Sequence, residues 1–227
     1  MQFVVVVLNM VSEVPQDRLV KVYFSESFAA ANVSFLNKFA KEQTELVSDI
    51  VFAQMSDTKT PQGALAIVKM AQYTVQDMMK DKPLLLLVEN LQDPGNLGTI
   101  IRTANAAGYG EIYLAECADA YSPKCVRASM SGIFFTKLYT LSREELPALF
   151  AGEKILAADM GGENVFTFRA EGKIVLAIGN EANGLSDVVK KLTAATVAIP
   201  MRGTQESLNA GVAAAVCMYA LRREKFL

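Results

Sequence analysis

Apolar and polar positions alternate in two different ways along the chain, and the change falls near Pro83. Before it, a β-branched run predicts a buried strand at 3–8, and two further strands are expected at 21–25 and 64–68. Apolar residues at 33–44 have helical spacing instead. The pattern predicts a small mixed α/β domain that ends near residue 70. A polar segment at 71–82, closed by Pro83, is the expected linker.

After Pro83 the predicted strands and helices alternate, which is typical of a parallel sheet. We expect strands at 84–88, 111–115, 132–138, 154–160, 173–178 and 196–200, with a Gly161–Gly162 turn after the fourth of them. We expect helices at 97–107, from Pro123, at 142–150 and at 207–224. Asn96 is predicted to cap the first of these helices and Gly108 to end it. The last helix is small and apolar over much of its surface, which core burial alone or a dimer contact would explain.

Composition narrows the possible chemistry. The 227 residues are 52% hydrophobic and 20% charged, as in a well-buried globular protein. The net charge of −2 gives no overall basic field, so a nucleic-acid partner would need local Lys and Arg groups. With no His and three Cys that lack a CxxC spacing, the chain has no Ser-His-Asp or Cys-His catalytic set, and most zinc sites are excluded. We expect no metal, and we expect the three thiols to be reduced and buried. The apolar start at 1–8 is too short to span a membrane, so the expected location is cytoplasmic.

Three polar segments that adjoin strand ends predict a ligand site. In the first, Gly98, Arg102 and Asn105 are spaced to share one helix face that begins near Asn96. An arginine among apolar residues indicates an anionic or polar partner, although an ordinary surface ion pair would explain it equally well.

The second segment is the turn Gly179–Gly184, which contains Glu181 and follows a predicted strand. It has neither GxGxxG nor GxxxxGK[ST], which argues against NAD and ATP. The third segment runs from Ile199 through Ser207 and Asn209, two residues that simple helix capping would also explain. Together, at three strand ends of one sheet, these segments favour a ligand site lined by backbone groups.

The same segments resemble a known family. Residues 90–108, 178–185 and 199–209 resemble, in order and spacing, the three motifs of the SpoU (TrmH-like) RNA 2'-O-ribose methyltransferases. The resemblance implies an α/β fold: a trefoil-knotted (SPOUT) parallel-sheet methyltransferase domain at 83–227, one of the rare knotted folds. Residues 1–75 resemble the L30e-like substrate-binding domain of many members, and we expect this domain to be truncated at its start.

The resemblance also implies a cofactor, partners and residue roles. S-adenosylmethionine (AdoMet) is expected in the knot, bound by Ile178, Gly179, Asn180, Gly184, Ile199, Met201, Ser207 and Leu208. The implied catalytic set is Arg102, Asn96, Glu181, Ser207 and Asn209. In it, Arg102 helps to deprotonate the ribose hydroxyl or stabilises its developing negative charge. The implied RNA contacts are Lys124, Arg127 and Arg202, and the family works as a homodimer.

The leading interpretation is methyl transfer to a ribose 2'-hydroxyl of structured RNA. Ribosomal RNA is preferred over transfer RNA because of the L30e-like domain. Two alternatives are a transfer RNA 2'-O-methyltransferase and a catalytically silent RNA-binding protein of the same fold. A third is a small-molecule-binding α/β domain, which would bind AdoMet without affinity for RNA. The chain carries Asn96, Arg102, Glu181, Ser207 and Asn209 together, which argues against a silent protein.

Overall fold

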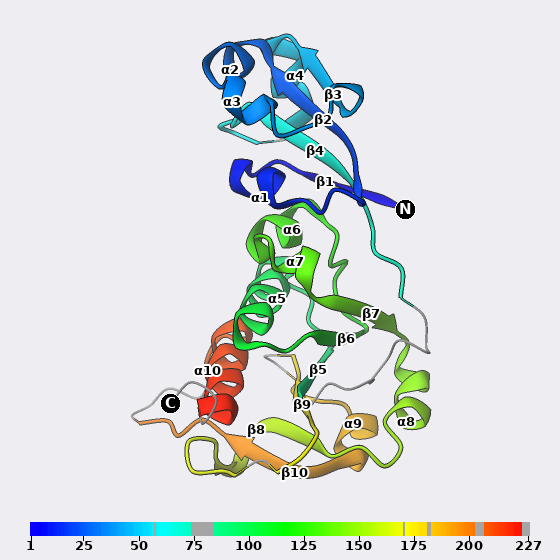
Figure 1. The fold of residues 1–227 in the computed structure, drawn as a ribbon. Coiled ribbons are helices and arrows are strands. Elements are labelled where there is room, and N and C mark those ends of the chain that lie inside the picture. The colour runs from blue at the N-terminus through cyan, green and yellow to red at the C-terminus, as the bar shows by residue number, and fades with distance from the viewer. Residues whose placement is uncertain (57, 74–83, 170, 181–182, 203–206, 224–227) are drawn as a thin grey trace.

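A computed structural model of the chain describes residues 1–56, 58–73, 84–169, 171–180, 183–202 and 207–223. These residues form two β-sheets, one from each half of the chain (Figure 1). The expected linker at 71–82 lies mostly outside the described residues.

The first sheet has four strands in the order β1-β4-β2-β3, with β4 antiparallel to both of its neighbours. Its strands are β1 (Gln2–Val5), β2 (Leu19–Ser25), β3 (Thr44–Val47) and β4 (Ala64–Lys69). Its helices are α1 (Leu8–Glu13), α2 (Glu26–Ala31), α3 (Val33–Leu36), a 3-10 turn (Lys41–Gln43) and α4 (Asp49–Ser56). The rings of Phe24, Phe28, Phe35 and Phe39 pack together with centroids 5.6 to 6.1 Å apart. This half therefore has an aromatic cluster of its own.

The second sheet has six parallel strands in the order β10-β8-β9-β5-β6-β7. The strands are β5 (Leu84–Glu89), β6 (Glu111–Ala115), β7 (Lys137–Leu141), β8 (Ile155–Asn164), β9 (Ile174–Ile178) and β10 (Thr193–Ala198). The helices are α5 (Pro94–Ala107), α6 (Pro123–Ser129), α7 (Gly132–Phe135), α8 (Leu146–Leu149, after a 3-10 turn at Arg143–Glu145), α9 (Asp187–Leu192) and α10 (Ala210–Arg222).

Both faces of this sheet are buried. Leu86 and Val88 of β5 pack with residues of α5, α6, α7 and α10, whereas Leu85 and Leu87 pack with residues of α8 and α9. Successive side chains of a strand point to opposite faces, so an uninterrupted apolar strand requires helices on both sides. Figure 1 shows α5 and α10 together on one side of the sheet, away from α8 and α9. The predicted parallel α/β sheet is confirmed, and the knot stays a prediction.

Helix α5 begins earlier than its predicted start. The Asp93 side chain caps it by accepting from the Asn96 N–H at 2.8 Å, and Pro94 takes the first helical position. The prediction that Asn96 is the cap is therefore wrong, because Asn96 already lies in the first turn. Gly108 ends the helix in the left-handed region (φ 77°), as predicted.

Two predicted strands are partly helical. Strand β1 ends at Val5 and α1 begins at Leu8, so the strand at 3–8 is too long. Residues 132–138 are mainly the short helix α7, and β7 starts only at Lys137. In short apolar runs such as these, periodicity does not distinguish a buried helix from a buried strand.

Other differences concern element boundaries. Helix α3 ends at Leu36, so the helix at 33–44 is too long, and α10 begins at Ala210, after the predicted start at 207. The strand at 196–200 begins at Thr193 and ends at Ala198, directly after the unpredicted helix α9.

The Gly161–Gly162 turn is wrong, because β8 continues through both glycines and pairs again with β10 at Glu163 and Val197. A Cβ on Gly162 would lie 2.5 Å from backbone atoms of Thr196 and Val197. Gly162 therefore allows the backbones of β8 and β10 to approach each other closely, and it does not form a turn.

The two halves are in direct contact. The ring of Phe3 lies 5.0 Å from that of Tyr121 and 6.3 Å from that of Phe134. Arg18 donates from Nε to the Lys69 carbonyl at 3.0 Å and from Nη1 to the Phe134 carbonyl at 3.3 Å. One continuous buried cluster therefore includes residues of both halves.

Candidate functional site

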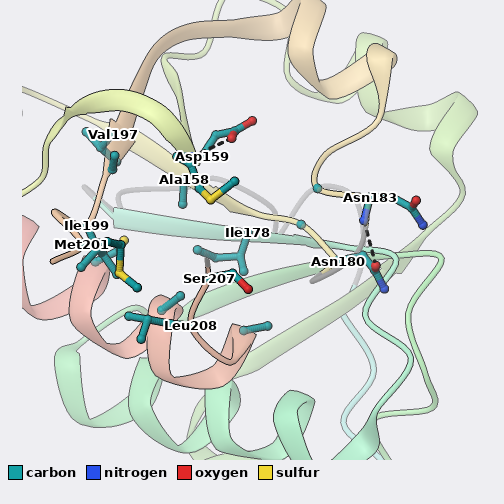
Figure 2. A pocket seen from close by; sticks show the side chains of 17 residues that line it. Ala158, Asp159, Ile178, Asn180, Asn183, Val197, Ile199, Met201, Ser207 and Leu208 are labelled. Atoms are coloured by element: carbon teal, nitrogen blue, oxygen red, sulfur yellow. Dashed lines mark hydrogen bonds between the residues drawn. The ribbon is translucent and has the colours of Figure 1, made fainter. Parts of the chain in front are cut away.

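A pocket of about 330 Å³ opens at the carboxyl ends of β9 and β10, between the middle of β8 and the start of α10 (Figure 2). In open α/β sheets this edge is where ligands bind. Its lining includes all eight residues predicted to bind a cofactor: Ile178, Gly179, Asn180, Gly184, Ile199, Met201, Ser207 and Leu208. The second and third polar segments thus form two walls of one pocket.

The first wall is a tight hairpin at the end of β9. Asn180 and Gly184 exchange two backbone hydrogen bonds of 3.1 and 2.9 Å, and Gly184 has a φ of 64°. Asn183 donates its N–H to Oδ1 of Asn180 at 3.2 Å, as Figure 2 shows. A Cβ on Gly179 would lie 2.4 Å from the Gly184 carbonyl carbon. Any side chain at residue 179 would therefore push the hairpin apart.

The hairpin is anchored to the end of β5. Asn180 donates from Nδ2 to the Asn90 carbonyl at 3.0 Å. Glu89, whose side chain is 1% exposed, accepts from the Ser186 N–H at 2.8 Å and from Nε of Arg143 at 2.9 Å. These bonds hold both ends of the segment that follows β9. Glu89 was not among the predicted site residues, although a carboxylate at the end of an otherwise apolar strand was a visible signal.

The second wall leads into α10. Asn209 caps this helix by accepting from the N–H groups of Gly211 and Val212 at 3.0 and 3.3 Å. Its Nδ2 also donates to Oδ1 of Asn96 at 2.9 Å. The first and third polar segments, 113 residues apart, therefore meet beside the pocket. The capping interpretation and the site interpretation of Asn209 are both compatible with this geometry.

The third wall was missed by sequence reasoning. It is formed by Ala158, Asp159 and Met160 of β8, with Cys217 of α10 also lining the pocket. Asp159, which ends the apolar part of β8, was a sequence signal for this wall. The neighbours of β8 in the sheet, however, cannot be deduced from the order of strands along the chain. Burial raises the pKa of the Cys217 thiol to about 11, so this part of the wall is uncharged at neutral pH.

The remaining members of the predicted catalytic set are not all at the pocket. Arg102 has an exposed side chain that is absent from the pocket lining and makes no hydrogen bond or ion pair with any described residue. Gly98 is buried against α6, whereas Asn105 is exposed, so the predicted face is only partly open to solvent. Glu181 lies outside the described residues.

The three cations predicted to contact RNA have different surroundings. Lys124 forms an ion pair with Asp93 at 2.6 Å, and this bond lowers the pKa of the Asp93 carboxyl. The same carboxylate caps α5, so Lys124 helps to fix the start of that helix. Arg127 is half-buried and Arg202 is exposed.

Within the described parts of the chain, no group of three or more His, Cys, Asp or Glu side chains is placed to hold a metal ion. None of the described helices is both long and apolar enough to cross a membrane.

The chain is an α/β protein with a parallel sheet and a pocket at its carboxyl edge, the place where proteins of this class bind small ligands. The chain belongs to the SpoU rRNA methylase family, whose model matches residues 83–219. Residues 8–74 match a second model, described as RNA 2'-O ribose methyltransferase substrate binding.

Individual relatives agree with this assignment. The chain is 36% identical over 188 residues to an uncharacterised tRNA/rRNA methyltransferase of Synechocystis, covering 80% of this chain and 68% of that protein. It is 32% identical over 187 residues to the 23S rRNA (guanosine(2553)-2'-O)-methyltransferase RlmP of Bacillus subtilis, covering 79% and 73%. The crystal structure of an AdoMet-bound rRNA methyltransferase from Sinorhizobium meliloti superposes with a TM-score of 0.85 at 26% identity, covering 98% of this chain and 87% of that one.

Proposed function

We propose that this chain transfers a methyl group from AdoMet to a ribose 2'-hydroxyl of ribosomal RNA. The observation that carries the proposal is the pocket in which all eight predicted cofactor residues come together. The family match, the relative that modifies 23S rRNA and the AdoMet-bound structural neighbour support it. Ribosomal RNA as substrate would place the enzyme in the cytoplasm.

The residues of the pocket fit the cofactor. Its volume of about 330 Å³ lies in the range of small-molecule sites. Ile178, Ile199 and Leu208 offer an apolar surface to an adenine ring, while strand ends and the hairpin offer backbone donors and acceptors. Glycine at 179 and 184 allows the ligand to approach the backbone closely.

The proposed chemistry is an in-line displacement. When bound, AdoMet supplies a methyl group carried on a sulfonium. The chain must orient the ribose oxygen, let its proton pass to solvent water and stabilise the negative charge that develops on it. The hydrogen-bonded pair Asn96–Asn209, with Ser207 on the pocket wall, provides polar groups that orient the ribose. Arg102 provides the positive charge that stabilises the oxyanion, and its exposure leaves it accessible to RNA.

The two domains and the remaining predicted site residues also receive roles in the proposal. Residues 1–75 act as the substrate-binding domain and 83–227 as the catalytic domain, with Glu181 supporting the turn after β9 or the RNA. Arg127 and Arg202 serve as phosphate contacts. Lys124 contributes mainly through its ion pair with Asp93, because that pair already neutralises its charge.

A homodimer is part of the proposal. Val212 and Tyr219 of α10 are 48% and 43% exposed, which is high for large apolar side chains on a helix that also packs on α5. A second copy of the chain would cover them. Light scattering at micromolar concentration tests this, and a monomeric mass would contradict it.

The central experiment combines calorimetry with tritium transfer from labelled AdoMet to unmodified 23S rRNA. The Arg102→Ala variant is expected to lose at least about 100-fold in turnover, in the range reported for removal of one oxyanion-stabilising group, while its AdoMet affinity stays unchanged. Lys190→Ala, which removes an exposed cation from α9, is the matched control and should retain full activity.

Each alternative predicts a different result. AdoMet binding with no transfer to RNA would replace the proposal with a small-molecule-binding protein. Transfer to transfer RNA alone would overturn the choice of substrate. Near-normal turnover in Arg102→Ala would remove that residue from the mechanism.

A further inference from the structure

A second pocket, of about 390 Å³, lies where the two halves of the chain meet. Val6 and Val7 contribute from the turn between β1 and α1, and Arg127 contributes from α6. The polar residues of the α4–β4 connection complete it: Thr58, Lys59, Thr60 and Gln62. The pocket is therefore assembled from both halves and is separate from the site at the edge of the large sheet.

Its two cations have no carboxylate partner among the described residues. The side chains of the exposed Lys59 and the half-buried Arg127 form no ion pair or hydrogen bond with any residue in the described parts of the chain, and no Asp or Glu is among the described residues of the pocket lining. Lys124 differs in this respect, because it lies one helical turn before Arg127 and is paired with Asp93 at 2.6 Å. Both cations line one pocket, so an anion bound there would be within reach of an ammonium and a guanidinium that have no carboxylate partner among the described residues.

The neutral groups suit the same kind of ligand. Gln62 accepts from the Leu8 N–H through Oε1 at 2.8 Å, which leaves its NH₂ group without a partner among the described residues. Thr60 supplies a hydroxyl. An amide NH₂, a hydroxyl, an ammonium and a guanidinium together form a set dominated by donors, which is the chemistry that binds phosphate oxygens.

The junction that carries the pocket is firmly packed. Phe3 is in ring contact with Tyr121 and Phe134, and Arg18 donates to carbonyls of both halves. Lys59 and Arg127 come from different halves and line the same pocket, so a ligand bound between them would contact both halves at once.

We propose that this junction pocket is a phosphate subsite that binds one phosphodiester of the RNA backbone. The identity of the ligand as RNA rests on the proposed function. The phosphate contact would fix the register of the RNA on both halves, while the pocket at the sheet edge selects the ribose. Phosphate contacts position an RNA without reading its sequence.

The test measures binding of labelled, unmodified 23S rRNA transcript by filter retention at several KCl concentrations. Lys59→Ala and Arg127→Ala are each expected to weaken binding about tenfold and to lower the salt slope by about 1. The double variant should lose less than the product of the single losses, because both side chains contact the same phosphate. Arg127→Lys keeps the charge and should retain the salt slope.

The matched control is Lys41→Ala, which removes an exposed cation from the same half of the chain, far along the sequence from the pocket. Its RNA affinity should equal that of the wild type. All variants should keep the wild-type AdoMet affinity, which also shows that they are folded.

Two outcomes overturn the subsite. In the first, the pocket variants bind the transcript as well as Lys41→Ala does. In the second, inorganic phosphate titrated by calorimetry binds in a manner that depends on Lys59 and Arg127 while RNA binding does not, which would mean that the pocket takes a free anion. The proposed function fails separately, if the wild type binds the transcript but transfers no methyl group to it. The binding curves still test the subsite in that case.

Discussion

The buried carboxylate Glu89 offers a sharp test of how the proposed cofactor pocket is held in shape. It connects the end of β5 to Ser186, which ends the segment after β9, and to Arg143, which follows β7. Replacing it with glutamine keeps the size of the side chain. The NH₂ group of the glutamine would then face a donor, either the Ser186 N–H or the Arg143 guanidinium.

The expected loss follows from the two bonds. A hydrogen bond to a charged group contributes about 1.5 to 3 kcal/mol. The Glu89 carboxylate that accepts from the Ser186 N–H is buried. The Arg143 side chain is 38% exposed, so solvent screening reduces the contribution of its ion pair with Glu89. We expect Glu89→Gln to lower the free energy of unfolding by about 2 kcal/mol and Glu89→Ala by about 3 kcal/mol. Because the hairpin at 179–184 loses its anchor, AdoMet affinity should fall about tenfold in both variants.

Urea unfolding followed by circular dichroism measures the first quantity, and calorimetry with AdoMet measures the second. Glu153→Ala is the control, because it also breaks an ion pair, to Lys173 at 2.7 Å, but does so outside the pocket lining. It should cost less than about 1 kcal/mol and leave AdoMet affinity unchanged. If Glu89→Gln unfolds and binds AdoMet as the wild type does, the anchor has no role in shaping the pocket.

Three further predictions test other parts of the structure. In Gly179→Ala, the added methyl group would lie 2.4 Å from the Gly184 carbonyl carbon, so calorimetry should find AdoMet affinity at least about tenfold lower; an unchanged Kd would contradict the tight hairpin. Asn209→Ala should lose about 1 kcal/mol of stability through the lost cap, whereas Asn209→Asp should keep the stability but, like the alanine variant, lose methyl transfer, because it cannot donate to Asn96. Burial raises the pKa of Cys117 and Cys217 to about 11, above the ordinary 9.0, so alkylation by iodoacetamide at pH 8 should be about 100-fold slower in the native protein than in urea. Because both pKa values are raised, the stabilising effect of the protonated thiols is complete below pH 9 and is lost as the pH rises toward 11. Rapid alkylation of Cys217 at pH 8 would contradict its burial on α10.

Local sequence patterns predicted the elements whose signals are strong. The uninterrupted apolar runs of β5, β6 and β9 required a sheet buried on both faces, and Gly108 ended α5 where a left-handed residue was expected. Short runs were less informative. Residues 132–135 form a helix and not a strand, because four apolar residues fit either state until neighbouring elements decide.

Within the site, the sequence by itself determined which residues end the strands, where glycine is needed and which family motifs are present. Only the tertiary structure decided how these residues combine. It brought Asn96 to Asn209, added the middle of β8 as a third wall, and left the Arg127 side chain without a described partner while pairing Lys124 with Asp93. The physical reason is that these contacts depend on the order of strands in the sheet and on the packing of helices distant in sequence. Local periodicity reports which side of an element is buried, but not which other element covers it.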